Sequence, residues 1–366
     1  MNYLSAKAKV ILTNCILLLL IVPLFAQTKT SPKYVESIKT AKNIILEFQE
    51  LKHVPGISVA VGVAGEIVWS EGFGYADLEN KVRVTTLTKF RIGSVSKPVT
   101  AAAIGLLVEQ GKLDLDAPIQ KYVTSFPQKK GKVTTRLLAG QLAGIRHYRN
   151  QEFLSSKKYR TVVQSLFIFQ DDTLLFMPGD DYSYSSYGWN LISAVVEKAA
   201  GQEFLSYMKA NVFKPLGLNN MVADHTDSII VNRTRFYVVA NGKALNAPFV
   251  DNSYKWAGGG FISNTEDLVQ FGSAHLEPGF LKQSTLDLFF TSQKKNSGEE
   301  TGYGIGWRIG TDDKGRKWRA HGGGSMGGTT YLILFPESKV VFAIVANISG
   351  ARFGDLPRKI SNLFIR

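Results

Sequence analysis

The sequence predicts an α+β fold in which an antiparallel sheet, flanked by helices, carries an inserted all-helical lobe. Residues 33–52 place apolar side chains on one side of a helix, and two strands rich in valine, isoleucine and aromatic residues follow at 56–63 and 65–75. Helical patterns then dominate from about 113 to 226, and strand patterns return only after that segment. We therefore expect early and late strands to join in one sheet, with the helical lobe between them in sequence.

The other elements are predicted from the same periodicities and from glycine and proline breakpoints. Helices are expected at 134–142, 160–169, 187–200, 203–211 and 358–365. Strands are expected at 236–240, 258–263, 304–309, 329–335 and 340–347. The polar, lysine-containing segment 283–301 is expected to be a loop.

The first 26 residues have the pattern of a signal peptide, which leaves one domain at 33–366. Lys7 and Lys9 precede a largely apolar run, and Ala26 offers a small residue for cleavage. The run is short for a membrane span, so we expect no stable membrane insertion after cleavage. Cys15, the only cysteine, lies in this segment, so a cysteine nucleophile or disulfide is excluded from the mature chain. The pattern favours an exported protein, in a bacterial periplasm.

The chain is basic, but it has no nucleic-acid signature. Its 43 lysine and arginine residues outnumber its 30 aspartate and glutamate residues, giving a net charge of +13. These basic residues are scattered, which indicates a solvated surface and no nucleic-acid partner. The five histidines lack metal-ligand spacing. We therefore expect no metal and no cofactor, while the oligomeric state stays open.

The strongest chemical signal is the entry to an apolar helix near residue 94. Gly93 allows a tight approach, Ser94 is placed to cap the helix, and Pro98 lies in the first turn. The apolar residues that follow, up to Val108, predict a buried helix. Ser94 and Lys97 are three apart and share one helix face. A neutral, desolvated lysine amine beside a serine can accept its proton and make it a nucleophile.

The same serine–lysine spacing occurs elsewhere, so the first pair needs partners. The other three pairs are interpreted as solvated helix faces or loops: Ser155 with Lys158, Ser206 with Lys209, and Ser292 with Lys295. Tyr184 and Ser186 form a tyrosine–x–serine pair just before a helix. A tyrosine near a lysine ammonium can ionise more easily and act as a general base or acid. Simple aromatic packing is the alternative reading of this cluster.

A third candidate segment begins at His321 and continues with three glycines. Small residues let a substrate approach a strand edge closely. A free N–H on that edge, together with the N–H of Ser94, would form an oxyanion hole. His321 would contact the serine–lysine pair, or else be a structural hydrogen-bonding residue. The glycines also match a dinucleotide-binding pattern, but they lead into a strand where that site needs a helix.

In their order along the chain, these motifs resemble those of the serine β-lactamase and penicillin-binding-protein superfamily, in the branch of class C β-lactamases, D-amino-acid peptidases and esterases. The motifs are Ser94…Lys97, Tyr184…Ser186 and His321…Gly323. Three longer stretches, at 144–148, 232–237 and 250–261, are similar to the mitochondrial serine β-lactamase-like proteins of this superfamily. The resemblance covers roughly residues 57–347 and implies a site between the sheet and the helical lobe.

This resemblance implies acyl transfer through an acyl-enzyme, without a cofactor. It assigns the nucleophile to Ser94, the paired lysine to Lys97 and the catalytic tyrosine to Tyr184. It assigns the oxyanion N–H groups to Ser94 and Gly324. It places the remaining substrate-binding positions at Ser186, His321 and Gly323.

Two departures bear on the substrate. Ser186 stands where class C β-lactamases carry asparagine, which argues against efficient β-lactam turnover. His321 begins a His-Gly-Gly sequence where those enzymes carry Lys-Thr-Gly, a change shared by many peptidase and esterase relatives. We therefore expect hydrolysis of a small peptide or ester. The alternatives are a β-lactamase or D-amino-acid cell-wall peptidase that takes β-lactam-like substrates, and a non-catalytic binding or scaffolding relative.

Overall fold

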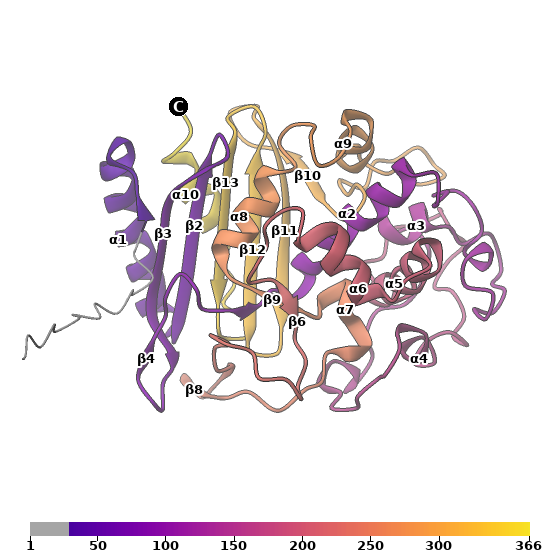
Figure 1. The fold of residues 1–366 in the computed structure, drawn as a ribbon, viewed down its shortest axis with the longest axis horizontal. Coiled ribbons are helices and arrows are strands. Elements are labelled where there is room, and N and C mark those ends of the chain that lie inside the picture. The colour runs from indigo at the N-terminus through magenta and orange to yellow at the C-terminus, as the bar shows by residue number, and fades with distance from the viewer. Residues whose placement is uncertain (1–28) are drawn as a thin grey trace, which may run out of the picture.

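The computed structural model describes residues 29–366, and the signal peptide predicted at 1–26 lies outside these described residues. Within them, eight strands form one antiparallel sheet in the order β1-β3-β2-β13-β12-β11-β10, with β4 paired to β3. Figure 1 shows this sheet on one side of the molecule and the helical lobe on the other. The predicted α+β class is therefore confirmed. The strands are β1 (Lys29–Thr30), β2 (Gly56–Val63), β3 (Glu66–Asp77), β4 (Val82–Arg83), β10 (Arg308–Thr311), β11 (Lys317–Ser325), β12 (Gly328–Phe335) and β13 (Val340–Ala346).

The central strand β13 is buried on both faces of the sheet. Val340, Phe342 and Ile344 belong to the hydrophobic cluster on one face, and Val341 and Val345 belong to the cluster on the other. Side chains alternate between faces along a strand, so each cluster receives every second residue. This double burial explains why the strand is a continuous apolar run in the sequence and does not alternate with polar residues.

Helices cover both faces of the sheet (Figure 1). α1 (Val35–Leu51) and α10 (Leu356–Asn362) pack on one face, and α8 (Thr265–Ser273) packs on the other. α1 turns Ile38 and Ile45 into the first cluster, at the spacing of one helix face. The sheet is thus the middle layer of a three-layer arrangement.

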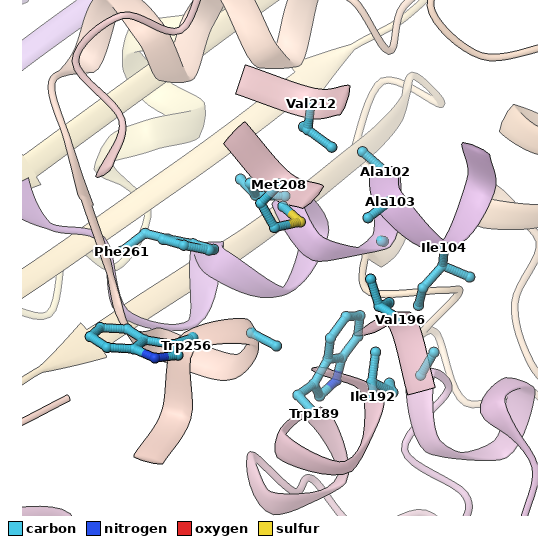
Figure 2. Close-up of a cluster of buried hydrophobic side chains, with 14 of the residues drawn as sticks. Ala102, Ala103, Ile104, Trp189, Ile192, Val196, Met208, Val212, Trp256 and Phe261 are labelled. Atoms are coloured by element: carbon cyan, nitrogen blue, oxygen red, sulfur yellow. The ribbon is translucent and has the colours of Figure 1, made fainter. Parts of the chain in front are cut away.

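The helical lobe packs around α2 (Ser96–Glu109), the helix that the sequence predicts to be buried. Every residue from Ser96 to Gly105 is buried, which confirms that prediction. Figure 2 shows Ala102, Ala103 and Ile104 of α2 among side chains of α5, α6 and α7. The helices of the lobe are α3 (Thr135–Ala139), α4 (Val162–Leu166), α5 (Tyr187–Ala200), α6 (Phe204–Met208), α7 (Trp256–Gly259) and α9 (Gln283–Phe290). Because α2 is fixed on all sides, its first turn is held rigidly against the sheet.

Short elements complete the described chain. Two further sheets are formed by β5 (Phe90–Arg91), β9 (Phe261–Ser263) and β6 (Val222–Ala223), and by β7 (Tyr237–Ala240) with β8 (Lys243–Asn246). The short helical turns are η1 (Pro32–Tyr34), η2 (Gly93–Val95), η3 (Ile119–Lys121), η4 (Glu152–Leu154), η5 (Lys209–Phe213) and η6 (Ser253–Lys255). Across residues 29–366, none of the helices has the length and apolar character needed to span a membrane.

Three sequence predictions are wrong in type. The segment 283–301 begins with a helix, α9, because Leu286 and Phe289 lie three apart and turn into the core. Residues 258 and 259 end helix α7, and the predicted strand starts only at Phe261. The strand predicted at 304–309 starts at Arg308, because the Gly304 N–H donates to the Trp307 carbonyl and makes a turn.

Two predicted helices are shorter than expected. α3 occupies five residues of the segment 134–142, and α4 occupies five residues of 160–169. In each case a threonine hydroxyl, on Thr134 or Thr161, caps the first turn by accepting a backbone N–H. The starts were therefore readable from the sequence, whereas the early ends depend on packing against the rest of the lobe.

Candidate active site

Two glycines allow the turn that holds Ser94 to lie against β11. Gly93 has φ +50°, and a Cβ there would lie 2.6 Å from the Gly324 carbonyl oxygen. A Cβ on Gly323 would lie 2.0 Å from the Ile92 carbonyl oxygen. No larger residue fits at either position without moving backbone. The close approach expected of Gly93 is confirmed, and the contact places the first turn of the buried helix beside the glycine strand.

Lys97 lies at the centre of the site. It is 0% exposed, and its Nζ lies 3.0 Å from Ser94 Oγ, 3.0 Å from Ser186 Oγ and 2.8 Å from the Gly258 carbonyl oxygen. Burial lowers the pKa of Lys97 well below its usual value, and the charges of Lys255 and Arg308 lower it further. Burial therefore favours the neutral amine over the ammonium. The neutral amine can donate to Gly258 and Ser186 and accept from the hydroxyl of Ser94.

Ser94 does not cap the helix as the sequence predicts. Ile92 and Val95 occupy the cap positions of η2 and α2, and neither makes a side-chain cap hydrogen bond. The Ser94 hydroxyl is directed to Lys97 Nζ. Pro98 does lie in the first turn of α2, as expected. The hydroxyl is thus available for chemistry, because it is not engaged in capping the backbone.

Tyr184 lies beside this pair, but its ionisation differs from the prediction. Its phenol is a hydrogen-bonding partner of the Ser94 side chain, and Lys97 Nζ lies 4.8 Å from its ring centroid. Burial raises the pKa of Tyr184, and the contact of its phenol with the Ser94 side chain offsets only part of that rise. The expected ease of ionisation is therefore wrong, because burial disfavours the charged form of the phenol. Tyr184 is a neutral phenol that can pass a proton.

His321 contacts the aromatic wall of the site. Its Nδ1 lies 2.7 Å from the Gly322 carbonyl oxygen, and its Nε2 lies 2.8 Å from the Tyr303 hydroxyl. A carbonyl can only accept, so Nδ1 carries the proton and Nε2 accepts from Tyr303. Burial lowers the pKa of His321 well below its usual value, which keeps the ring neutral. Its ring centroid lies 6.2 Å from that of Tyr184, so its contact with the serine–lysine pair is indirect.

The glycine segment of β11 provides the open strand edge that the sequence predicts. β10 pairs with β11 only between Lys317 and Ala320, so beyond that point one edge of β11 faces the turn of Ser94. A Cβ on Gly324 would meet no atom within 4 Å. The amide of Ser94 belongs to the first turn of a helix, where backbone N–H groups lack intrahelical partners. The Ser94 turn and Gly324 thus line the same pocket, and the assignment of their N–H groups to an oxyanion hole stays a prediction.

A pocket of about 380 Å³ opens beside Ser94. A larger cavity of about 800 Å³ contains none of the residues predicted for catalysis, so we assign the chemistry to the smaller pocket. Its lining is formed by Ser94, His147, Tyr148, Phe153, Ser186, Lys255, Gly258, Gly259 and Gly324. Sequence reasoning missed Lys255 and His147 as pocket residues. A lysine inside the otherwise uncharged segment 252–261 was the available signal.

The other serine–lysine pairs do not build such a site. Lys158 and Lys295 form ion pairs with carboxylates, and Lys209 is exposed. None of these lysines is buried against a serine hydroxyl. The surface reading given to these pairs therefore agrees with the structure.

A buried lysine beside a serine at the start of a buried helix, opposite a glycine strand edge, defines a class of serine-dependent acyl hydrolases. The family model described as Beta-lactamase matches residues 41–362, and the chain belongs to this family. It is a serine hydrolase of the β-lactamase and penicillin-binding-protein superfamily, as the resemblance implied.

Sequence relatives lie in two groups. The chain is 33% identical to the human serine beta-lactamase-like protein LACTB, mitochondrial, in an alignment that covers 83% of this chain and 73% of the human protein. It is 25% identical to penicillin-binding protein 4* of Bacillus subtilis strain 168, covering 81% of this chain and 69% of that protein. The likeness to mitochondrial proteins predicted from the longer stretches is confirmed.

Solved structures share the fold over most of the chain. The octameric penicillin-binding protein homologue from Pyrococcus abyssi has a TM-score of 0.74 and 26% identity, covering 86% of this chain and 74% of that one. EstCE1, described as a hydrolase with promiscuous acyltransferase activity, has a TM-score of 0.79 and 20% identity, covering 92% and 100%. The second likeness is one of fold alone.

Proposed function

We propose that the protein hydrolyses an amide or ester through an acyl-enzyme on Ser94. The observation that carries the proposal is the buried Lys97 amine, 3.0 Å from Ser94 Oγ, with Ser186 and the Gly258 carbonyl as its other partners. No carboxylate is among these partners, so nothing holds the lysine in its charged form. A neutral amine in this position is a general base for the serine hydroxyl.

In the acylation step, Ser94 Oγ attacks the substrate carbonyl carbon while its proton moves to Lys97 Nζ. The carbonyl oxygen becomes an oxyanion that the N–H groups of Ser94 and Gly324 would stabilise. When the intermediate collapses, the bond to the leaving amine or alcohol breaks. The Tyr184 phenol gives that group a proton and takes one back from the Lys97 ammonium. Lys97 is then neutral again.

Deacylation uses the same groups in the opposite direction. A water molecule attacks the acyl carbon and loses its proton toward Lys97 through Tyr184. The ester bond to Ser94 then breaks, and Ser94 regains its proton. Ser186, 2% exposed, and the His321–Tyr303 pair would act as positioning residues, because they hold Lys97 and the aromatic wall in place.

A β-lactamase or D-amino-acid peptidase is the second candidate. Family membership and the relative named penicillin-binding protein 4* favour it. Ser186 in place of asparagine counts against efficient β-lactam turnover. We further propose export to a bacterial periplasm, which the signal-peptide pattern at 1–26 supports. N-terminal sequencing of the protein recovered from a periplasmic fraction tests export, and an uncleaved cytosolic chain would contradict it.

The experiment for the proposed function is a substrate panel with wild-type protein and a Ser94→Ala variant. Nitrocefin, D-alanyl peptides, L-peptides and short 4-nitrophenyl esters are compared side by side. We expect ester or peptide cleavage to dominate and to fall by about 10³-fold or more in the variant, the usual loss when a nucleophile is removed. Ser165→Ala, at a buried serine away from the pocket, is the matched control. Full activity in Ser94→Ala would eliminate Ser94 as nucleophile.

A further inference from the structure

The pocket beside Ser94 contains a cation that the proposed mechanism does not use. Lys255 ends η6, is 2% exposed and lines the pocket together with Ser94. Among residues 29–366, its Nζ has no hydrogen-bond or ion-pair partner, and only more distant charges act on it. Buried charged groups in proteins are normally paired. A buried amine without a partner that opens into a pocket is placed to take up a proton and pair with an anionic ligand.

Two carboxylates in this part of the structure, Asp224 and Glu152, are already engaged with other cations. Asp224 accepts from Arg91 Nε at 2.6 Å and from Asn252 Nδ2 at 2.9 Å. Glu152 accepts from both terminal nitrogens of Arg146, at 2.7 and 2.9 Å. Neither carboxylate lines the pocket, and the pocket lining contains no acidic residue. Lys255 is therefore unpaired because these carboxylates are engaged with arginines and lie outside the pocket.

Aromatic rings surround the lysine without neutralising it. Nζ lies 4.4 Å from the ring centroid of Phe153, 5.1 Å from that of Tyr254 and 5.6 Å from that of Tyr148. Ring faces attract a cation, but they supply no negative charge. They hold the ammonium in position and form apolar walls for the carbon chain of a ligand.

His147 adds a second donor to the same pocket. Its Nδ1 accepts the Ser186 backbone N–H at 3.1 Å, so the ring proton lies on Nε2. Burial lowers the pKa of His147 to about 4, so the ring is neutral near pH 7. The pocket thus combines an ammonium with an imidazole N–H, which suits an anion.

The position of the proton donor decides which half of the substrate enters the pocket. In the proposed mechanism, Tyr184 protonates the leaving group, so the leaving group lies on the Tyr184 side of Ser94. The pocket is lined by Ser186 and Lys255, and neither Tyr184 nor His321 belongs to its lining. The half of the substrate that enters this pocket is therefore the acyl half.

We propose that this pocket binds a carboxylate carried by the acyl part of the substrate, with Lys255 as its counter-ion and His147 as a second hydrogen-bond donor. A volume of about 380 Å³ holds a short acyl chain that ends in a carboxylate. The assignment names a substrate class for the Ser94 site and rests on the proposed function for the orientation of that substrate.

The test compares esters that differ only in charge. Mono-4-nitrophenyl glutarate carries a carboxylate on the acyl chain, and 4-nitrophenyl 5-methylhexanoate is its neutral isostere. Spontaneous cleavage is subtracted for each. We expect wild type to favour the anionic ester by about 10- to 100-fold in kcat/KM, the range of one charged hydrogen bond. That ratio should fall close to 1 in Lys255→Met and recover partly in Lys255→Arg. Lys214→Met, at an exposed lysine outside the pocket, is the matched control and should keep the wild-type ratio.

A second pair of esters tests the orientation. The acetate ester of 4-hydroxybenzoate carries the carboxylate on the leaving group, and the acetate ester of 4-hydroxybenzamide is its neutral match. Their ratio should not respond to Lys255→Met. If it responds while the glutarate ratio does not, the acyl-side assignment is wrong.

Binding without turnover separates this inference from the proposed function. Calorimetric titration of Ser94→Ala protein with methyl hydrogen glutarate should show binding that dimethyl glutarate lacks, and Ser94→Ala/Lys255→Met should lose it. If this discrimination is present but wild type cleaves no ester, the carboxylate site stands and the hydrolytic function falls. Equal ester ratios in wild type and Lys255→Met, or equal binding of both glutarates, would overturn the carboxylate site.

Discussion

At the scale of single residues, two buried lysines meet in one site with different surroundings. Lys97 has two hydroxyls and a carbonyl within 3.0 Å, whereas Lys255 has only aromatic rings close to it. Burial lowers the pKa of both, and the charge of Lys255 contributes to the effect on Lys97. The first lysine is suited to accept a proton. The second is suited to receive a negative charge.

The activity on a neutral ester should fall on acidification as Lys97 becomes protonated. Lys97 is an active base above its pKa, and its pKa is held down by burial, by Lys255 and by Arg308. Removing a positive charge raises the pKa of a neighbouring lysine. The acid limb of kcat/KM against pH should therefore move to higher pH in Arg308→Gln, with exposed Arg160→Gln as control. An acid limb that stays in place, or moves to lower pH, would contradict the assigned base.

Lys255→Met should make the folded protein more stable. It removes an unpaired ammonium from a buried position, and the expected gain in the free energy of unfolding is about 1–4 kcal/mol. The pKa of Lys255 is lowered by burial from 10.5 to about 7, so the folded state resists protonation that the unfolded chain accepts. The gain should be largest below about pH 7 and should shrink as the pH approaches 10.5. Urea unfolding at several pH values measures it, and a loss of stability at pH 6 would show that Lys255 has a protein partner.

At the scale of elements, the site depends on the contact between η2 and β11. The turn that holds Ser94 is in contact with the glycines of β11, and a side chain at Gly323 would meet the backbone of Ile92. The position of Ser94 relative to the strand edge is therefore fixed by direct contact between backbone atoms of the two segments. Such a contact cannot adjust by rotating a side chain.

Gly323→Ala should displace the Ser94 turn, whereas Gly322→Ala should not. The added Cβ at 323 would lie 2.0 Å from a backbone oxygen, while at 322 the nearest atom is a Tyr331 ring carbon at 3.4 Å. We expect Gly323→Ala to lower the free energy of unfolding by about 1–3 kcal/mol and to slow labelling of Ser94 by a fluorophosphonate by about 10-fold or more. Gly322→Ala should stay within about 0.5 kcal/mol of wild type. Equal labelling rates in the two variants would show that this contact does not position the nucleophile.

Sequence alone predicted the elements whose signals are local. The helix expected at 187–200 has exactly the bounds of α5, since Gly201 stops it in a left-handed conformation. Ser94 and Lys97 were found because they are neighbours on one helix turn. Helix α9 was missed because the segment 283–301 is polar overall, and only packing shows that Leu286 and Phe289 face the core.

Long-range partners were harder to predict. Tyr303 as the partner of His321 and Gly258 as a partner of Lys97 give no sequence signal, because each contact joins segments set by the whole fold. The lack of a partner for Lys255 depends on which residues the fold places around its Nζ, and sequence patterns do not show which residues those are. We expect these long-range contacts, more than the shared motifs, to determine which substrate a member of the family binds.

At the scale of the whole molecule, the site lies where the sheet layer meets the helical lobe (Figure 1). η2 brings Ser94 and α2 brings Lys97, while the segment before α5 brings Tyr184 and Ser186, and β11 brings Gly324. Family membership rests on the match to the Beta-lactamase family model over residues 41–362 and on relatives at 33% identity, and solved structures keep the fold at 20 to 26% identity. The shared fold positions the residues for acyl transfer, and the lobe residues that line the pocket determine which substrate binds.

The central claim is that neutral Lys97 activates Ser94 as the nucleophile. Its most direct measurement is mass spectrometry of wild-type and Lys97→Met protein after incubation with a 4-nitrophenyl ester and acid quenching, followed by peptide mapping. The mechanism predicts an acyl adduct on the peptide that contains Ser94 in wild type, and none in Lys97→Met at the same time point. An adduct on another residue, or equal acylation of Ser94 without Lys97, would contradict it.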